Sequence, residues 1–136
     1  MSKGLGQIQR DLLTQLEGRT TVVDTFTLAA DVYRLEPNSD GMRVLNDAQL
    51  VSVRRALLKL ASAGKAFKIM RGHDKRAYWA NERLGLWLTV RQLQQKSMVI
   101  AAAGDNDTMM AHAEAMIPLI IRAKNLGVDV DNSAFA

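Results

Sequence analysis

The sequence has no cysteine, two histidines and two prolines among its 136 residues. Without cysteine the chain has no disulfide framework, no thiolate metal site and no cysteine nucleophile. Two histidines far apart in the sequence, His73 and His112, do not make a metal site on their own. This composition fits a reducing compartment, and we expect a cytoplasmic protein that holds no metal.

Long apolar runs are missing as well. The longest candidate, Met116 to Ile121, is short and contains Pro118, whereas a helix needs about 20 apolar residues to span a bilayer. The first residues, Met-Ser-Lys-Gly-Leu-Gly, place no apolar segment behind their positive charge, as a secretory signal would. With 48% hydrophobic and 24% charged residues, the composition is typical of a soluble globular protein. We therefore expect no membrane partner.

Catalytic motifs are the third absence. No serine lies in a nucleophile-elbow context, there is no glycine-rich phosphate loop, and no pair of carboxylates stands out. The aspartates Asp105, Asp107, Asp129 and Asp131 lack the spacing and the glutamate of an EF-hand. We therefore expect a protein that is not an enzyme and needs no cofactor.

Positive charge is present, and it is concentrated in one part of the chain. The net charge is +4. From Arg54 to Arg83 there are nine Lys and Arg against two Asp and Glu, whereas Gly85 to Ala136 has four against five. A local excess of this kind is typical of a surface that binds phosphate. The alternative is a charged face that is merely solvated.

The first 81 residues are expected to form three helices and three strands. In the first helix Ile8, Leu12 and Leu16 share one stripe. Pro37 ends the second helix, because the residue before a proline leaves helical space. In chain order the expected elements are helix Gly6–Glu17, strand Thr20–Val23, helix Thr25–Leu35, loop Glu36–Leu45, helix Asn46–Gly64, and strands Ala66–Arg71 and Arg76–Asn81.

The third helix has a predicted cap and two predicted faces. Asn46 can cap it, and Gln49 can reach back in a capping box. Its apolar residues recur at helical spacing and predict a core face, and its polar residues predict an outward face. The core face consists of Leu50, Val53, Leu57 and Leu60, and the outward face of Gln49, Ser52, Arg55 and Lys59, with Arg54 beside them.

The two strands after this helix predict a β-hairpin that closes on Gly72 to Lys75. This closure pairs Ile69 with Tyr78 and Phe67 with Ala80, which makes one face of the hairpin apolar. The other face would then carry Lys68, Met70 and Trp79.

This order of elements is that of a winged helix-turn-helix. Ser52 to Gly64 also matches the pattern Ser/Thr-Val-Arg-Arg/Gln-Ala-Leu-x-x-Leu-x-x-x-Gly, so the third helix resembles the recognition helix of GntR-type bacterial regulators. The resemblance implies a phosphate contact by Ser52, a DNA-groove contact by Arg54 and a wing over Arg71 to Arg76. GntR-type proteins have a short turn between their second and third helices, whereas Glu36–Leu45 is long. The resemblance therefore supports the winged-helix class and not membership of that family.

Two further helices are expected, over Gly85–Ala103 and Thr108–Asn125. Pro118 either kinks the second of them or starts a separate short helix. Their broad apolar surface predicts a two-fold homodimer, since such helices need a partner to cover them. The expected interface residues are Trp87, Met109, Met116, Ile117, Ile120 and Ile121.

We therefore expect a mainly α fold with a small β-hairpin: a winged helix-turn-helix at residues 4–83, a dimerising helical extension at 84–127 and a flexible tail at 128–136. The expected function is sequence-specific binding of double-stranded DNA by a small bacterial, phage or plasmid regulator. One alternative is a winged-helix adaptor that binds protein through an apolar patch of Met70 and Trp79. Another is a repressor with an effector pocket between the C-terminal helices. The expected DNA-binding residues are Gln49, Ser52, Arg54, Arg55, Lys59, Lys68, Arg71, His73, Lys75 and Arg76.

Overall fold

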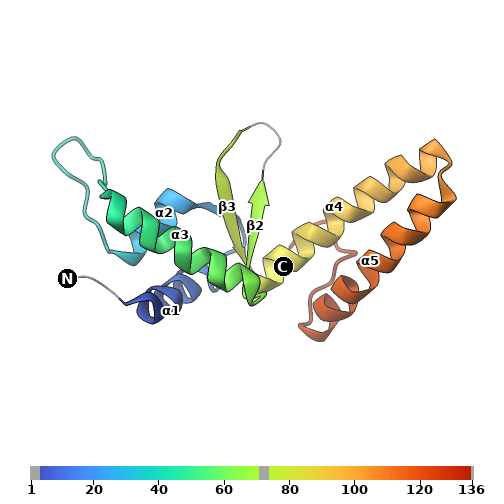
Figure 1. Ribbon diagram of the computed structural model, residues 1–136, viewed down its shortest axis with the longest axis horizontal. Helices are drawn as coiled ribbons and strands as arrows, with labels where there is room; N and C mark the ends of the chain where they lie inside the picture. Colours follow the sequence, from blue (N-terminus) through green and yellow to red (C-terminus); the bar gives the residue numbers. More distant parts are fainter. Residues whose placement is uncertain (1–3, 71–73, 136) are drawn as a thin grey trace. The chain divides into compact units, whose positions relative to one another are not determined.

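The computed structural model describes residues 4–70 and 74–135 (Figure 1). Over these ranges the chain is mainly helical, with a small antiparallel sheet whose strands lie in the order β1-β3-β2. It divides into two compact units, unit 1 at residues 1–82 and unit 2 at residues 83–136; the expected boundary lay one residue later. The elements are α1 (Leu5–Leu16), β1 (Val23–Asp24), α2 (Thr25–Val32), α3 (Asp47–Ser62), β2 (Ala66–Met70), β3 (Ala77–Asn81), α4 (Glu82–Ala103) and α5 (Asn106–Asn125).

The core of unit 1 lies where its three helices meet the sheet. The predicted apolar stripe of α1 is buried, as are three of the four predicted core positions of α3, and the fourth, Leu50, is partly buried. Burying such side chains stabilises a domain by about 1.5–3 kcal/mol each. The core residues include Ile8, Leu12, Leu16, Leu28, Val32, Val53, Leu57 and Leu60.

Two predicted elements of unit 1 are shorter in the structure than expected. The strand expected at Thr20–Val23 is the two-residue strand β1. The second helix ends at Val32 and not at Leu35. Arg34 has a φ of 52°, and the amide of Leu35 donates to the carbonyl of Ala30 at 3.0 Å. This is a Schellman turn, in which a left-handed residue ends the helix before the proline does.

The long loop between α2 and α3 is held to the helices by Asp31. Arg43 of the loop donates to one carboxylate oxygen of Asp31 at 2.6 Å, and Arg19 donates to the other at 3.1 Å. One aspartate on α2 therefore anchors both the loop and the segment after α1. The insertion that separates this chain from the GntR pattern is thus fastened to the domain by ion pairs.

The predicted cap of α3 and the predicted register of the hairpin are confirmed. Asn46 accepts from the amide of Gln49 at 2.8 Å, and the Gln49 side chain accepts from the amide of Asn46 at 3.1 Å. In the sheet, Phe67 pairs with Ala80 and Ile69 with Tyr78. Both features depend on residues close together in the sequence.

The predicted faces of the hairpin agree with this register, but Trp79 is buried and not exposed on its face. This side chain is 3% exposed and lies in the core cluster with Ala66 and Val23. Lys68 and Met70 share its side of the hairpin, because alternate residues of a strand face the same way, but they lie nearer the tip and are exposed. Trp79 is the largest apolar side chain of the sheet. Burying its area against the helices stabilises the domain more than the regular apolar pattern of the other face would suggest.

The buried tryptophan also ties the sheet to α2. Its indole Nε1 donates to the hydroxyl of Thr25 at 2.8 Å, and that hydroxyl donates to the carbonyl of Ala77 at 3.4 Å. Thr25 is the first residue of α2. The first turn of α2 is therefore held beside the start of β3.

Unit 2 contains an antiparallel pair of helices, α4 and α5 (Figure 1). His112 is packed as expected, with its Nε2 2.7 Å from the carbonyl oxygen of Leu93, and Ser97 donates to the sulfur of Met116 at 3.6 Å. α5 continues through Pro118, so the prediction of a separate helix was wrong. Pro118 is exposed, where water can hydrate the carbonyl that the missing N–H leaves free.

The tail of unit 2 packs on α4, although the sequence predicted a flexible segment. Val128 and Val130 are buried. The carbonyl of Asn132 accepts from the indole of Trp87 at 3.1 Å and from Arg91 at 2.9 Å. Phe135 lies 6.0 Å from the Trp87 ring. Val128, Val130 and Phe135 are the larger apolar residues of this tail, and Phe135 contacts Trp87 of α4. These contacts hold the tail on the helix.

The bond between Trp79 and Thr25 predicts energetic coupling in unit 1. Trp79→Phe and Thr25→Val should each lower the free energy of unfolding by about 1–2 kcal/mol. The double variant should lose less than the sum of the two, since both changes remove the same hydrogen bond. Urea unfolding of the four proteins measures this. Trp87→Phe is the matched control, and it should show no coupling to Thr25→Val. Additivity of the Trp79 and Thr25 changes would contradict the bond.

Candidate functional site

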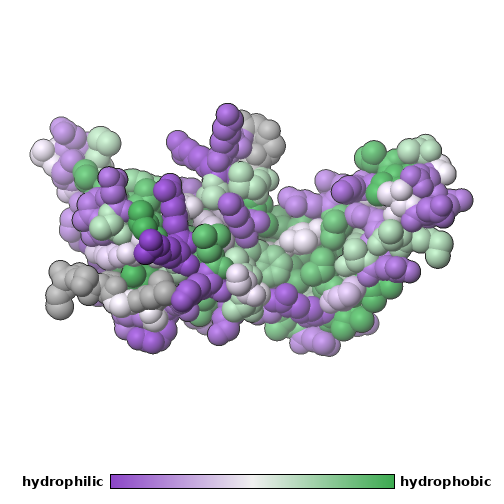
Figure 2. All heavy atoms as spheres, in the orientation of Figure 1, coloured by the Kyte–Doolittle hydropathy of each residue, from purple (hydrophilic) through white to green (hydrophobic). Residues whose placement is uncertain are grey.

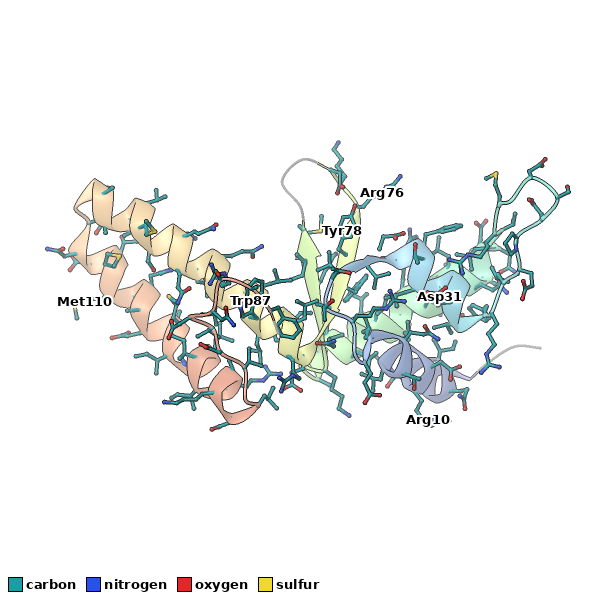
Figure 3. The ribbon with its side chains drawn as sticks, turned by 180° about the vertical axis from the view of Figure 1, so that it is seen from behind. Arg10, Asp31, Arg76, Tyr78, Trp87 and Met110 are labelled. Carbon is teal, nitrogen blue, oxygen red and sulfur yellow. The ribbon has the colours of Figure 1, made fainter. Side chains whose placement is uncertain are left out.

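A groove of about 680 Å³ lies in unit 1 between α2, α3 and the residues that lead from the hairpin turn into β3. Three basic side chains line it: Arg54 comes from α3, and Lys75 and Arg76 precede β3. Figure 3 shows Arg76 extending from the hairpin on the side of α2. The other lining residues are Asp24, Thr25, Phe26, Thr27, Leu50 and Ala77.

The short strand β1 places these walls beside one another. Val23 pairs with Trp79 and Asp24 with Tyr78, so the chain enters α2 next to the residues that lead into β3. On the hairpin, Asp74 accepts from the amide of Arg76 at 3.1 Å and from the hydroxyl of Tyr78 at 2.8 Å. These bonds order the backbone that carries Lys75 and Arg76. The groove is therefore built on the sheet and not on a free loop.

The basic side chains of this groove differ from Arg19 and Arg43. Arg19 and Arg43 are used in ion pairs with Asp31. Within the described residues, the side chains of Arg54, Lys75 and Arg76 form no hydrogen bond or ion pair and are exposed. The positive charges of these three side chains are therefore available to bind an anion, and binding would not require an ion pair within the protein to break first.

One acidic group shares the groove. Asp24 caps α2: its carboxylate accepts from the Thr27 hydroxyl at 2.6 Å and from the Thr27 amide at 3.2 Å. Burial alone would raise the pKa of Asp24, but these hydrogen bonds and the nearby charge of Arg76 together hold its pKa below the ordinary value of 3.8. Asp24 is therefore ionised at neutral pH and offsets part of the positive charge.

A second basic surface lies on the outer face of α3. Arg55 and Lys59 are exposed there, and so are the apolar residues Val51 and Leu58. In Figure 2 hydrophilic side chains surround α3 and the visible part of the hairpin, with apolar side chains between them. Arg54 lies on the flank toward the groove. The outer face of α3 therefore presents alternating basic and apolar side chains.

The remaining predicted residues of unit 1 fall in different places. Ser52 is half-buried and lies ~200° around α3 from Arg54, at 3.6 residues per turn. Gln49 is half-buried, and its side-chain oxygen is used in the cap; the prediction that it faces outward was wrong. Lys68 is exposed on β2. Arg71 and His73 lie outside the described residues.

Sequence reasoning missed three exposed apolar residues at this surface. Phe26 lines the groove, and Val51 and Leu58 lie on the outer face of α3. The signal was available for the last two. Once Val53 and Leu57 are assigned to the core, Val51 and Leu58 fall on the opposite side of the helix with Arg55.

The six residues predicted for a dimer interface differ in their exposure to solvent. Met116 is buried within unit 2, and Trp87 is half-buried beneath the tail, with Arg91 5.0 Å from its ring. Met109 and Ile120 are half-buried. Only Ile117 and Ile121 are exposed, at 53% and 55%. The chain itself covers Met116 and part of Trp87, which leaves less of these two side chains for a second copy.

Comparisons of the chain with known protein families, with curated proteins and with solved structures find no match. In residues 4–70 and 74–135, no group of three or more His, Asp or Glu side chains could hold a metal ion. No helix in these ranges is long and apolar enough to cross a membrane.

The lowered pKa of Asp24 predicts a pH-dependent contribution to stability. A carboxyl whose pKa is depressed by folding stabilises the protein above its unfolded pKa, and the contribution is lost as the pH falls through the folded pKa. Asp24→Asn keeps a capping oxygen but removes the charge. The difference in unfolding free energy between this variant and the wild type should be largest near neutral pH and shrink below about pH 4. Urea unfolding at pH 7 and pH 3 measures it. Asp105→Asn, at the α5 cap, is the matched comparison, because hydrogen bonds to Thr108 lower the pKa of Asp105 as well, and its difference should also shrink at low pH. An Asp24 difference independent of pH would contradict the argument.

Proposed function

We propose that unit 1 is a winged helix-turn-helix domain that binds double-stranded DNA. Two features support the winged-helix assignment. The elements follow one another as helix, strand, helix, helix, strand, strand, and the sheet order is β1-β3-β2. In this assignment α3 is the recognition helix and the β2–β3 hairpin is the wing.

The observation that carries the proposal is the groove with three uncommitted basic side chains. Arg54 comes from the candidate recognition helix, whereas Lys75 and Arg76 come from the candidate wing. Residues that are 21 and 22 positions apart in the sequence thus direct positive charge into one groove. Asp24 offsets part of this charge, but within the part of the chain that the structure describes none of the three forms an ion pair of the kind that joins Arg19 to Asp31. A duplex offers closely spaced phosphates to such a surface.

The chemistry of each part suggests its role. α3 enters the major groove, where an arginine fork can donate to guanine O6 and N7 and an apolar side chain such as Val51 can contact a thymine methyl group. Arg55 and Lys59 lie on the same outer face. Lys75 and Arg76 bind the phosphates beside the groove, which fixes register and adds no sequence information.

The alternative hypothesis, that unit 1 is an adaptor that binds another protein, is now less well supported. That alternative required an apolar patch made by Met70 and Trp79 on the hairpin, and Trp79 is buried in the core. The apolar residues of the α3 face are interleaved with Arg54, Arg55 and Lys59, a mixture that suits a nucleic acid better than an apolar protein surface. We therefore favour DNA, with the protein acting as a small bacterial, phage or plasmid regulator in the cytoplasm.

A homodimer is part of this proposal. Dimeric winged and helix-turn-helix proteins bind two half-sites about one helical turn apart. A two-fold dimer of this chain would therefore prefer an inverted repeat in DNA. The surface that forms the dimer is argued separately below.

DNA binding should depend strongly on salt. If one protomer makes ~4 to 5 phosphate contacts, the logarithm of the binding constant should fall against the logarithm of salt concentration with a slope near −4 per protomer. Fluorescence anisotropy with a labelled duplex, from low to physiological salt, measures the slope. A flat response, or no binding at low salt, would contradict DNA as the partner.

Single substitutions should separate sequence recognition from phosphate binding. Arg54→Ala should cost about 1–3 kcal/mol on the preferred site and reduce discrimination between sites. Lys75→Ala should weaken all sequences alike. Asp24→Asn should act in the opposite direction and strengthen binding, because it removes the negative charge from the groove. Binding sites selected from random duplexes, followed by anisotropy, provide the measurements.

Arg43→Ala is the matched control for the loss of an arginine, since that side chain is paired with Asp31 away from the groove. It should change stability and leave site preference intact. If Arg54→Ala left both affinity and preference unchanged, α3 would not be the recognition helix.

A further inference from the structure

We propose that α5 binds a second copy of this chain, antiparallel, through one exposed stripe. The stripe faces away from the buried residues Met116 and Ala123 of the same helix, and its apolar members Met110, Ile117 and Ile121 are 66%, 53% and 55% exposed. This inference specifies the interface of the homodimer proposed above, and it rests on no part of the DNA-binding argument. We call the following residues the α5 stripe: Met110, Ala113, Glu114, Ile117, Ile121 and Lys124.

The spacing of the stripe follows from the helix period. Apart from the neighbours Ala113 and Glu114, successive members are three or four residues apart, which keeps them on one side of an α-helix over about four turns. Figure 3 shows Met110 at the outer surface of the helix pair. An apolar stripe of this kind on an outward face is typical of a helix that packs against another helix.

Charge complementarity identifies the partner as a second copy. Glu114 lies three residues before Ile117, and Lys124 lies three residues after Ile121. Both charged residues are exposed, and within the described residues neither forms an ion pair. The stripe therefore has a negative group at one end, a positive group at the other and two isoleucines between them.

An antiparallel two-fold pairing of two such stripes matches the four central members, Glu114, Ile117, Ile121 and Lys124. When Ile117 lies opposite Ile121 of the second copy, Glu114 lies opposite Lys124 of that copy, and the symmetry repeats both contacts. Four isoleucines then form an apolar centre with an ion pair at each end. A parallel pairing would instead place Glu114 against Glu114 and Lys124 against Lys124. The charges therefore select both the partner and its direction.

The other exposed apolar residues of unit 2 fit a partner less well. Met98 and Val99 of α4 are exposed, but they are adjacent in the sequence and point to different sides of the helix. They make no stripe, and Gln92, Gln95 and Lys96 are exposed around them. The interface is therefore assigned to α5 alone.

Charge reversal tests the register. Glu114→Lys places lysine opposite Lys124 of the second copy, and Lys124→Glu places glutamate opposite Glu114. Each variant should raise the dimer dissociation constant about tenfold, because both symmetry-related pairs become repulsive. The double variant carrying both changes should dimerise as the wild type does. An equimolar mixture of the two single variants should form a heterodimer, since every pair is then attractive.

Sedimentation equilibrium of the full chain gives the dissociation constants, and Lys96→Glu on α4 is the matched charge control. Ile117→Ser and Ile121→Ser should shift the protein to monomer, whereas Met98→Ser should not. Thermal unfolding shows that each variant is folded. A wild type that is monomeric at tens of micromolar, or a double variant and mixture that stay dissociated, would overturn the proposal. The Ile117→Ser variant also separates dimerisation through α5 from DNA binding by unit 1. If this variant is monomeric and still binds half-site DNA with a steep salt dependence, each proposal can be tested without the other.

Discussion

The arrangement of unit 1 depends on burying Trp79 between the sheet and the helices. Its ring joins β3 to the core, and its N–H donates to Thr25 at the first turn of α2. A tryptophan N–H in the core would be costly without an acceptor. Because Thr25 is that acceptor, α2 begins beside the start of β3. Together with the pairing of β1 and β3, this contact brings two walls of the groove beside one another.

Local features of the fold could be predicted from the sequence, whereas features that need the third dimension could not. The capping box of Asn46 and Gln49 and the hairpin register follow from neighbours in the chain, and both are confirmed. The burial of Trp79 was missed, since both faces of β2 and β3 carry apolar residues and periodicity alone cannot rank them. The early end of α2 at Val32 was missed, because a left-handed arginine is a weak sequence signal for a Schellman turn.

The candidate site shows the same division. The excess of Lys and Arg between Arg54 and Arg83 is visible in the sequence, and so is the amphipathic character of α3. Which of two adjacent arginines shares a groove with the hairpin is decided by the rotation of α3 about its axis, and the core residues Val53 and Leu57 set that rotation. The sequence also cannot distinguish a committed arginine from a free one. Asp31 commits Arg19 and Arg43 only because the long loop folds back on α2.

The charges of the two units suit two different kinds of contact. Residues 1–82 carry 13 Lys and Arg against nine Asp and Glu, and residues 83–136 carry five of each. A neutral unit 2 lets two copies approach without long-range repulsion, and its stripe relies on apolar burial at Ile117 and Ile121, which salt does not screen. A contact between unit 1 and phosphate weakens as salt rises. Under the two proposals, dimerisation should therefore persist at salt concentrations that release DNA.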